Sequence, residues 1–593
     1  MKKKTFGTLF LPLIIFVICS VTTRAQNNIP DEWITRFEKS GGLATPSYQE
    51  SIEYFKKFTQ SSKFAKMTEF GISPQGRKLW YLVVSSSGDF TPEKLKNSSK
   101  PLLFVLNGIH SGEIEGKDAS MLLLREILIT GEKSGWLEGF NLVLIPVFSV
   151  DGHERKSKYN RINQNGPEEM GWRTTAQNYN LNRDWMKADA PEMQAMLRLL
   201  SSLTPDFLID NHTTNGADYQ YTVTYGLEKF KNLHDSLAHS VTKSFIPYMQ
   251  KYVEEQGFLI APYVGFRGDT PETGLVDWAG TPRFSTGYTA IQNRIGLLVE
   301  THMMKPYKDR VYSTKSVMEA AMTWLLANGK KLKALNKTAD ESSVQDFTVK
   351  GRYFPVAFRN TNDSVMFTYK GIEVKEEESI ISGASKNVYT GEPYTVEIPF
   401  FNNSVPSDSV TAPHAYIIPK EWSFITERLK LHGIEVQSVL EDKEMTVTRY
   451  KFYDYKFSTN SYEGRQTVTT KYKEFTEATK VPAGSYIVYT NQRTIRVILT
   501  ALEPKSGDSY LRWGFMNNIF ERKEYFEDYV MERVALEMYY QDKNLAEEFN
   551  KRLREDAKFR EDKNARLNWF YERSPYFDKQ YLVYPIMRIE KKN

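Results

Sequence analysis

Three apolar segments of the chain lead into side chains that bind metal ions or move protons. Two imidazoles and one carboxylate form a ligand set for catalytic zinc, which keeps a fourth position for water. A further carboxylate nearby can act as a general base. The residues are His110 and Glu113 after segment 102–106, His212 after segment 206–210, and Glu300 at the end of segment 295–300.

Strands of a sheet would have to bring these side chains together. Short apolar runs at 102–106, 142–147, 206–210 and 295–300 are typical of buried strands, and helical periodicity separates them at 117–129, 191–200 and 317–335. This alternation predicts an α/β fold, with a mixed, mostly parallel sheet flanked by helices. Ligands of such sheets bind beyond the carboxyl ends of the strands, so we expect the polar residues at one rim.

Each of these residues has an ordinary structural interpretation when it is taken alone. His110 could be a loop or capping residue, and Glu113 could favour the first turn of the following helix through the helix dipole. Glu300 could be half of an ion pair. The joint pattern is far more specific than any one member, and it favours a metal site.

Further motifs give the chain a resemblance to a known family. His110-Ser-Gly-Glu113 resembles the first zinc motif of the zinc metallocarboxypeptidases of the carboxypeptidase A and B type. The family's other motifs have counterparts in 149–152 (SVDG), Trp172-Arg173, 179–184 (YNLNRD), Asn211-His212 and Glu300. The resemblance covers about residues 45–330. The chain is identified as a secreted bacterial member with a C-terminal extension.

The resemblance implies a complete hydrolytic site. His110, Glu113 and His212 would hold one Zn²⁺ ion, which lowers the pKa of a bound water to roughly 7. Glu300 would take the water proton and pass it to the leaving amine. Arg173 would stabilise the developing oxyanion, and Asn182 with Arg183 would bind the terminal carboxylate of the substrate, as the family motif implies. The implied partner is a peptide with a free C-terminal carboxylate.

The chain departs from the family pattern at one position beside the metal. The family commonly has Asp two positions before the substrate-binding Asn, and this chain has Asn180. An amide oxygen still accepts a hydrogen bond from the first zinc histidine but brings less negative charge. We therefore expect Asn180 to soften the site without abolishing zinc binding.

Two side chains of the implied substrate pocket are harder to assign. Tyr288 is a candidate for the family's mobile tyrosine, and Val276 is a candidate for the lining of the side-chain pocket. Packed core residues are an equally good interpretation of both. His153 and His302 lie close to motif residues and are assigned to support rather than to the metal.

The N-terminus predicts export. Lys2–Lys4, the apolar run 9–21 and Ala25 describe a signal peptide over 1–25, with a periplasmic or extracellular destination. An anchor helix or a lipid anchor on Cys19 are the alternatives. Removing this segment takes Lys plus Arg from 78 to 74 against 73 acidic residues, so the net charge falls from +5 to +1. The charge therefore indicates no nucleic-acid partner, and no later segment is apolar enough to span a membrane.

The C-terminal half carries no catalytic constellation. Its aromatic density, for example in 451–457, fits either a carbohydrate or peptide platform or a packed core. The predicted parts are a signal peptide (1–25), a lead-in (26–44), a catalytic domain (45–335), a linker (336–345), a β-rich accessory domain (346–500) and a mainly helical region (501–593).

These observations favour one function and leave two alternatives. The first is a zinc-dependent carboxypeptidase that hydrolyses the C-terminal peptide bond of peptides. The second is a zinc amidohydrolase or carboxypeptidase that acts on peptidoglycan stem peptides, which also present a terminal carboxylate to Arg183. The third, a non-catalytic binding protein on a peptidase fold, requires the loss of a ligand or of the base, and all of them are present.

Overall fold

The computed structural model describes residues 29–591. The predicted signal peptide and Cys19 lie outside these residues. Residues 29–34 contain one 3-10 turn, η1 (Asp31–Trp33), and belong to a separate unit from the chain that follows. Within the described part of the chain, no helix is both long and apolar enough to cross a bilayer.

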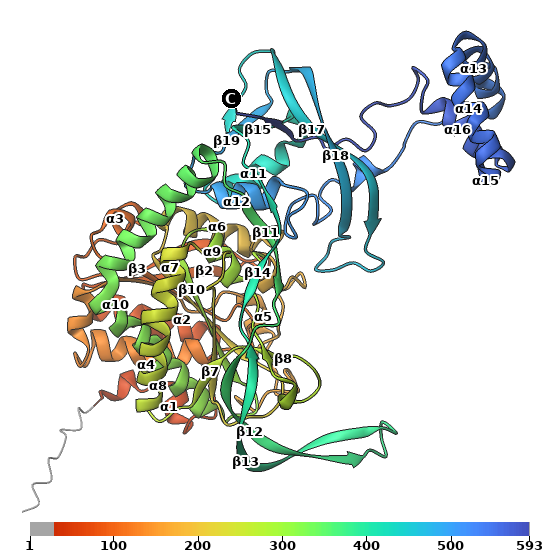
Figure 1. Cartoon of the computed structure of the whole chain (residues 1–593). Helices are drawn as coiled ribbons and strands as arrows, with labels where there is room; N and C mark the ends of the chain where they lie inside the picture. The colour runs from red at the N-terminus through yellow and green to blue at the C-terminus, as the bar shows by residue number, and fades with distance from the viewer. Residues whose placement is uncertain (1–28, 592–593) are drawn as a thin grey trace, which may run out of the picture. The chain divides into compact units, whose positions relative to one another are not determined.

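An eight-stranded mixed sheet forms the centre of the first half of the chain (Figure 1). Its four inner strands pair in parallel in the order β4-β3-β5-β10, and antiparallel strands flank them. This confirms the predicted fold class. In spatial order the strands are β1 (Ala65–Ile72), β2 (Lys78–Val84), β4 (Asn141–Ile145), β3 (Leu102–Asn107), β5 (Phe207–Thr214), β10 (Ile295–His302), β6 (Val223–Leu227) and β7 (Ile260–Pro262).

Helices bury both faces of the sheet, which explains why its inner strands are continuously apolar. Every residue of β3 is buried. Phe104 and Leu106 pack in one core with α6 and α9, and alternate residues such as Val105 face the other side, where α4 lies. The helices of this region are α1 (Arg36–Lys39), α2 (Tyr48–Ser61), α3 (Pro92–Asn97), α4 (Glu115–Leu128), α5 (Val150–Glu154), α6 (Pro191–Leu203), α7 (Asp235–Ser240), α8 (Ile246–Glu255), α9 (Ser285–Ile291) and α10 (Tyr307–Val344).

The prediction of a linker over 336–345 is wrong. These residues form the last turns of α10 and the start of a short π-helical segment, η6 (Gln345–Val349). The buried face of the helix continues through Leu332, Asn336, Ala339 and Ser343, which follow helical spacing. Three of these four residues are small or polar, so the segment shows no apolar period in the sequence. Asn336 donates hydrogen bonds to the backbone carbonyl and the side chain of Asp206, and these bonds offset the cost of burying its amide.

The next part of the chain is β-rich, as predicted, and one of its hairpins joins the first half. Strand β13 pairs in parallel with β9 through Phe400–Leu275 and Phe401–Val276. The strands concerned are β8 (Gly265–Phe266), β9 (Leu275–Val276), β12 (Val365–Glu378) and β13 (Ser385–Phe401), and a separate two-stranded sheet contains β11 (Phe354–Asn360) and β14 (Ser404–Val410).

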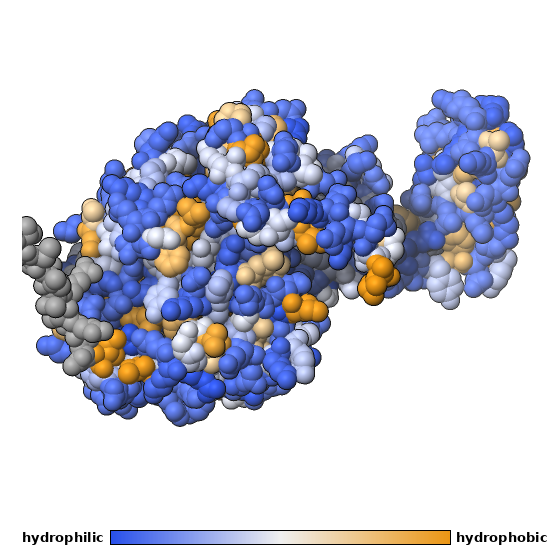
Figure 2. Space-filling model, turned by 90° about the horizontal axis from the view of Figure 1, so that it is seen from below, coloured by the Kyte–Doolittle hydropathy of each residue, from blue (hydrophilic) through white to orange (hydrophobic). Residues whose placement is uncertain are grey.

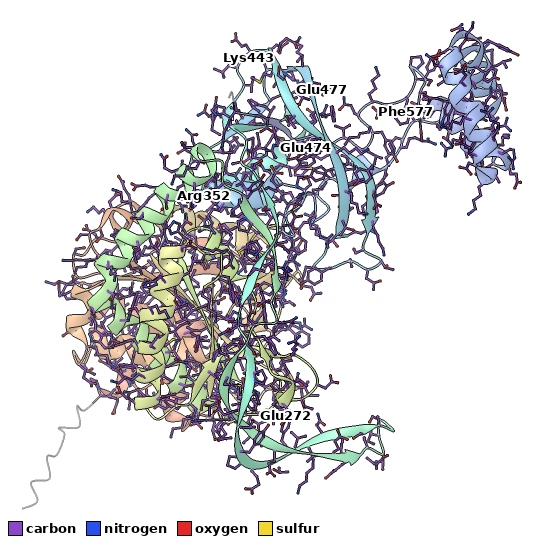
Figure 3. The ribbon with its side chains drawn as sticks, in the orientation of Figure 1. Glu272, Arg352, Lys443, Glu474, Glu477 and Phe577 are labelled. Atoms are coloured by element: carbon purple, nitrogen blue, oxygen red, sulfur yellow. The ribbon has the colours of Figure 1, made fainter. Side chains whose placement is uncertain are left out.

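A six-stranded sheet follows and shares its core with the first half. Ile425 of α11 and Ile498 of α12 belong to the same apolar cluster as α6 and α9. Glu477, labelled in Figure 3, accepts a hydrogen bond through Oε1 from Nη1 of Arg449 on the neighbouring strand, at 2.9 Å. The elements are β15 (Ala415–Ile418), η7 (Lys420–Trp422), α11 (Ser423–Leu431), β16 (Gln437–Ser438), β17 (Lys443–Phe457), β18 (Val468–Val481), β19 (Tyr486–Tyr489), α12 (Ile495–Leu502) and β20 (Met587–Ile589).

Four helices form a small bundle with its own apolar core between residues 528 and 571. Phe549 is central to this core, where its ring contacts Phe559, Trp569 and Phe570. The helices are α13 (Asp528–Gln541), α14 (Lys543–Glu555), α15 (Ala557–Glu561) and α16 (Lys563–Tyr571).

The face of the molecule in Figure 2 is mostly hydrophilic, with apolar side chains in scattered small patches.

Candidate metal centre

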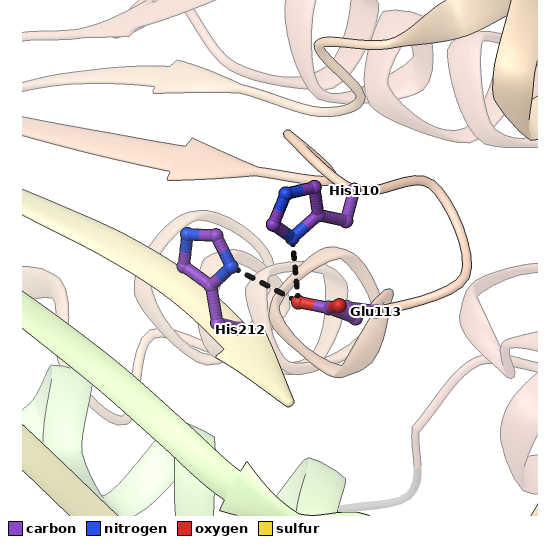
Figure 4. Close-up of side chains that lie close together, drawn as sticks. All are labelled: His110, Glu113 and His212. Atoms are coloured by element: carbon purple, nitrogen blue, oxygen red, sulfur yellow. Dashed lines mark hydrogen bonds and ion pairs between the residues drawn. The ribbon is translucent and has the colours of Figure 1, made fainter. Parts of the chain in front are cut away.

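His110, Glu113 and His212 converge at the carboxyl ends of β3 and β5 (Figure 4). His110 and Glu113 lie on the turn between β3 and α4, and His212 lies within β5. Glu113 Oε2 is 3.1 Å from His110 Nδ1 and 2.9 Å from His212 Nδ1. The ligand atoms of the three residues all lie within 4.8 Å of one another, and all three side chains are buried. The group can therefore hold a metal ion.

The second nitrogen of each histidine faces an oxygen acceptor. His110 Nε2 is 2.9 Å from Asn180 Oδ1, as the sequence predicts, and His212 Nε2 is 3.0 Å from Asp210 Oδ2. An acceptor at Nε2 favours the proton there, and this tautomer leaves the Nδ1 lone pair for a metal. The two histidines differ in charge environment, because one is paired with an amide and the other with a carboxylate.

These surroundings shift the pKa values of the histidines in opposite directions. Burial lowers the pKa of His110 to about 4, against the attraction of the Glu113 carboxylate. Burial also disfavours the charged form of His212, but Asp210 and Glu113 outweigh it and raise the pKa of His212 well above its usual value. The neutral form that a metal requires is thus favoured for His110 by its surroundings alone.

Glu113 is held as a carboxylate by several donors. Burial favours its neutral form, but His110 and Arg161 outweigh this and hold the pKa of Glu113 well below its usual range. Arg161 and Arg173 lie 2.6 Å and 3.2 Å from Glu113 Oε1, and the Thr213 backbone donates to Oε2 at 3.2 Å. The negative charge that a cation needs is therefore present.

Arg161 is a contact that the sequence analysis missed. It lies on the loop between α5 and α6, 48 residues beyond Glu113 and outside every recognised motif. Its side chain also explains Gly112, where an added Cβ would approach Arg161 Cγ to 2.7 Å and the Gly171 carbonyl to 2.9 Å. Only a residue without a Cβ fits between the metal motif and this loop.

Glu300 lies beside the three candidate ligands. Its strand β10 pairs with β5 so that Glu300 is opposite His212. Within residues 29–591 its Oε2 atom has no hydrogen-bond partner. Burial raises the pKa of Glu300 to about 8, with His212 lowering it and the Glu113 and Asp210 carboxylates raising it further. A buried carboxyl with a raised pKa and a free oxygen can accept and release a proton.

A cavity of about 640 Å³ opens onto this group. Arg173 and Arg183 line it together with Asn182, so the sequence-predicted substrate residues are brought to the same space as the metal group. Arg183 stacks on Phe284 at 4.3 Å and donates to the Asn182 carbonyl at 2.7 Å. Asn182 Nδ2 in turn lies 3.4 Å from His212 Nε2. The cavity therefore combines a cation-binding group, a carboxyl and two guanidinium groups.

The structure does not bring Tyr288 or Val276 into this cavity. Tyr288 is buried on α9, and its hydroxyl lies 3.0 Å from His432 Nδ1. Val276 lies on the short strand β9, where it pairs with Phe401. Both predictions are corrected: the tyrosines that line the cavity, among the described residues, are Tyr159 and Tyr263. Tyr263 follows β7 with no motif around it, so its sequence position gave no signal.

Two other histidines lie outside the candidate ligand group. His153 is buried with its Nε2 atom 3.1 Å from the Lys117 ammonium, and burial lowers its pKa to about 4. His302 ends β10 and packs against Tyr219 in a tilted arrangement, with a ring-centre distance of 4.5 Å. Both contacts are those of packing residues.

Comparison with known proteins finds similarity to carboxypeptidases. A Zinc carboxypeptidase family model matches residues 52–263. Carboxypeptidase 2 of Trichophyton rubrum is 22% identical over 494 residues, which cover 80% of this chain and 85% of that protein. The crystal structure of carboxypeptidase A from Helicoverpa armigera matches with a TM-score of 0.36 and 16% identity, covering 48% of this chain and 74% of that chain. A metallo-carboxypeptidase structure from Burkholderia cenocepacia also matches with a TM-score of 0.36 and 16% identity, over 48% of this chain and 70% of that one.

Proposed function

We propose that this chain, whose residues 52–263 match the zinc carboxypeptidase family model, removes the C-terminal residue of peptides. The observation that carries the proposal is the shared cavity. It holds the group His110, Glu113 and His212 beside the carboxyl of Glu300 and the guanidinium of Arg183. A metal site with a base beside it suits hydrolysis, and a cation within reach suits a substrate with a free carboxylate.

One Zn²⁺ ion fits the donor set of His110, Glu113 and His212. Two imidazole nitrogens and one carboxylate are a ligand set of catalytic zinc sites. The acceptors at the two Nε2 atoms keep both Nδ1 atoms available as ligands. When bound, zinc lowers the pKa of a coordinated water to about 7 and so supplies a nucleophile at neutral pH.

Glu300 transfers the proton, and Arg173 stabilises the negative charge that develops on the substrate. Glu300 Oε2 accepts the proton of the attacking water and later delivers it to the amine that leaves. The side chain of Arg173 is 42% exposed, and its guanidinium donates to the oxygen of the scissile carbonyl as negative charge develops there.

Arg183 and Asn182 select the end of the peptide. The guanidinium of Arg183 offers paired donors to a terminal carboxylate, and stacking on Phe284 limits its motion. The amide of Asn182 lies between Arg183 and the metal group and can donate to the same carboxylate. A substrate held in this way is cut one residue from its end.

We further propose that the enzyme acts outside the cytoplasm. The proposal rests on the basic start, the short apolar run and Ala25 of the N-terminal segment. N-terminal sequencing of the protein recovered from the medium or the periplasm of an expression host tests it. A mature chain that begins close to residue 26 is expected.

The function is tested by metal analysis combined with peptide hydrolysis. We expect one zinc ion per chain and release of the C-terminal residue from free peptides, with no cleavage of the same peptides carrying a C-terminal amide. The variant Glu300→Gln keeps the shape of the side chain and should lower kcat by about 100- to 10,000-fold with unchanged zinc content. Equal activity of this variant, a metal-free active enzyme, or equal cleavage of the amidated peptides contradicts the proposal.

A further inference from the structure

A second cavity adjoins the catalytic cavity. It has a volume of about 160 Å³. Thr214, Asn215 and Tyr263 line both cavities, so the two spaces meet at the end of β5, just beyond His212. The proposed catalytic roles do not use this second cavity.

The largest side chains in the walls of the second cavity are aromatic, and they come from both halves of the chain. Phe367 and Tyr369 lie on one face of β12, since they are two residues apart on a strand. The first half contributes Tyr219, Tyr221 and Phe266. The Tyr221 hydroxyl donates to the Thr368 carbonyl and accepts from the Lys370 amide, both at 3.1 Å. This hydroxyl is therefore satisfied by the β12 backbone.

Main-chain and side-chain contacts fix β12 against the first half. The side-chain Nε2 of Gln220 donates to the carbonyls of Gly371 at 3.1 Å and Tyr394 at 2.8 Å. The backbone N–H of Gln220 donates to the Lys370 carbonyl at 3.0 Å. The parallel pairing of β13 with β9 fixes the hairpin at a second point. The aromatic walls are thus held in place before any substrate binds.

The size and lining of this cavity suit one large apolar side chain. An apolar cavity of about 150 Å³ in a protein interior holds a benzene molecule. Aromatic rings also pair favourably with an incoming ring in edge-to-face geometry. A Phe, Tyr or Leu side chain matches this space, whereas a charged side chain would lose its hydration there.

The place of the cavity indicates which substrate residue enters it. The residues at the carboxylate-binding end of the catalytic cavity, Arg183, Phe284 and Leu298, do not line the second cavity. A peptide with its carboxylate on Arg183 and its scissile bond at the metal group must continue away from Arg183. Its next residues reach Thr214 and Asn215, where the second cavity opens.

We propose that this cavity binds an aromatic or large aliphatic side chain on the N-terminal side of the scissile bond, and that β12 makes it a selective site. The inference rests on the proposed carboxypeptidase function. It assigns part of the substrate preference to Phe367 and Tyr369, which lie outside the segment that matches the family.

Two peptide series test this inference on the zinc-loaded full-length enzyme. One series varies the residue just before the scissile bond, and the other varies the residue before that, through Phe, Leu, Ala and Lys with a constant C-terminal residue. We expect Phe or Leu to exceed Ala and Lys at one of these positions by at least tenfold in kcat/KM. No hydrolysis of any free peptide overturns the proposed function and the inference with it, whereas hydrolysis without this preference overturns the inference alone.

Two variants and a matched control locate the preference. Phe367→Ala removes one wall, and Ala261→Leu fills the cavity from β7; each should reduce the Phe-to-Ala ratio by at least fivefold. Met366→Ala is the control, because Met366 neighbours Phe367 on β12 but is 62% exposed. If Phe367→Ala unfolds the hairpin, Ala261→Leu still decides, since it adds volume and removes no contact. An unchanged ratio in Ala261→Leu, or a loss as large in Met366→Ala, contradicts the inference.

Discussion

Glu300 in the catalytic region and Glu503 in the C-terminal region are both buried, but the protein treats their carboxyl groups differently. Glu503 lies just beyond α12 and accepts from the hydroxyls of Tyr416 and Tyr450 and from Arg588. Glu300 has an oxygen without a hydrogen-bond partner anywhere in residues 29–591. In this pair, the carboxylate outside the cavity has its oxygens occupied, whereas the one that lines the cavity leaves an oxygen for the substrate or water.

The largest effect on stability should come from breaking the satisfied cluster. Arg588→Met removes the cation that faces Glu503 at 3.1 Å and leaves a buried carboxylate without a counter-charge. We expect the free energy of unfolding to fall by about 3–5 kcal/mol, measured by urea denaturation. Lys471→Met is the control, because its partner Asp454 is 55% exposed, and it should change stability by less than about 1 kcal/mol. Equal decreases in the free energy of unfolding of the two variants would mean that burial does not increase the stabilisation by the ion pair.

Glu192, in the first turn of α6, is a buried carboxyl whose oxygens have no hydrogen-bond partner among the described residues, although it does not line the catalytic cavity. It therefore tests what an unpaired buried carboxylate costs in stability. Burial raises its pKa from 4.5 to about 7, and the nearby Asp151 and Asp184 add to the shift. The folded state therefore holds the proton more tightly than the unfolded state does. Glu192 costs no stability below about pH 4.5, and its cost grows up to about pH 7 and then stays constant.

Glu192→Gln removes this cost. At pH 8 the variant should be more stable than the wild type by up to about 3 kcal/mol, since each pKa unit corresponds to about 1.4 kcal/mol. At pH 4 the two should be equally stable. Thermal unfolding at both pH values measures the difference, and an advantage that does not depend on pH would contradict the assigned cause.

A smaller effect is expected where the C-terminal region supports Arg183, the arginine proposed to bind the substrate carboxylate. Asp508 accepts from the Arg283 backbone at 3.2 Å and from its Nε atom at 2.8 Å. The next residue, Phe284, stacks on Arg183. Asp508→Asn weakens this support, so KM for free peptides should rise about fivefold, which corresponds to about 1 kcal/mol, while kcat changes less. Lys505→Gln, at an exposed pair with Asp408, is the control. A fall in kcat with an unchanged KM would contradict the positioning role.

The smallest expected effect concerns the amide beside the first metal histidine. Asn180→Asp gives His110 the charged acceptor that His212 already has in Asp210. We expect zinc affinity, measured by competition with a chelator, to rise by up to about tenfold. Asn178→Asp on the same loop is exposed and should leave the affinity unchanged. Unchanged affinity and an unchanged pH profile of activity in Asn180→Asp would show that one carboxylate partner is enough.

The sequence predicts the parts of the molecule where neighbours along the chain determine the outcome. Strand β3 is apolar throughout because both of its faces are covered, and the ligand candidates follow such strands directly. The partner Asn180 was also predictable, because it belongs to a motif. Arg161 and Tyr263 were not, because they enter the cavity from loops whose paths depend on packing far along the chain.

Distant contacts also explain why the predictions for Tyr288 and for the end of α10 were wrong. Tyr288 lies near the expected sequence position, but its hydroxyl lies beside His432, which is 144 residues away. The end of α10 lacks large apolar residues because Asn336 and Ala339 fit closely against the sheet region. In each case the deciding contact lies between segments that are distant in the sequence.

The small helical bundle interrupts the chain between two points that meet in space. The Leu582 amide donates to the Ile519 carbonyl at 3.3 Å, so the chain leaves the six-stranded sheet region and returns to it at the same place. Beyond Leu582 the chain supplies β20, which lies between β15 and β17 in that sheet. The bundle is thus topologically an insertion. A short turn joining these two points would close the gap, so the bundle can be excised or exchanged without rerouting any strand.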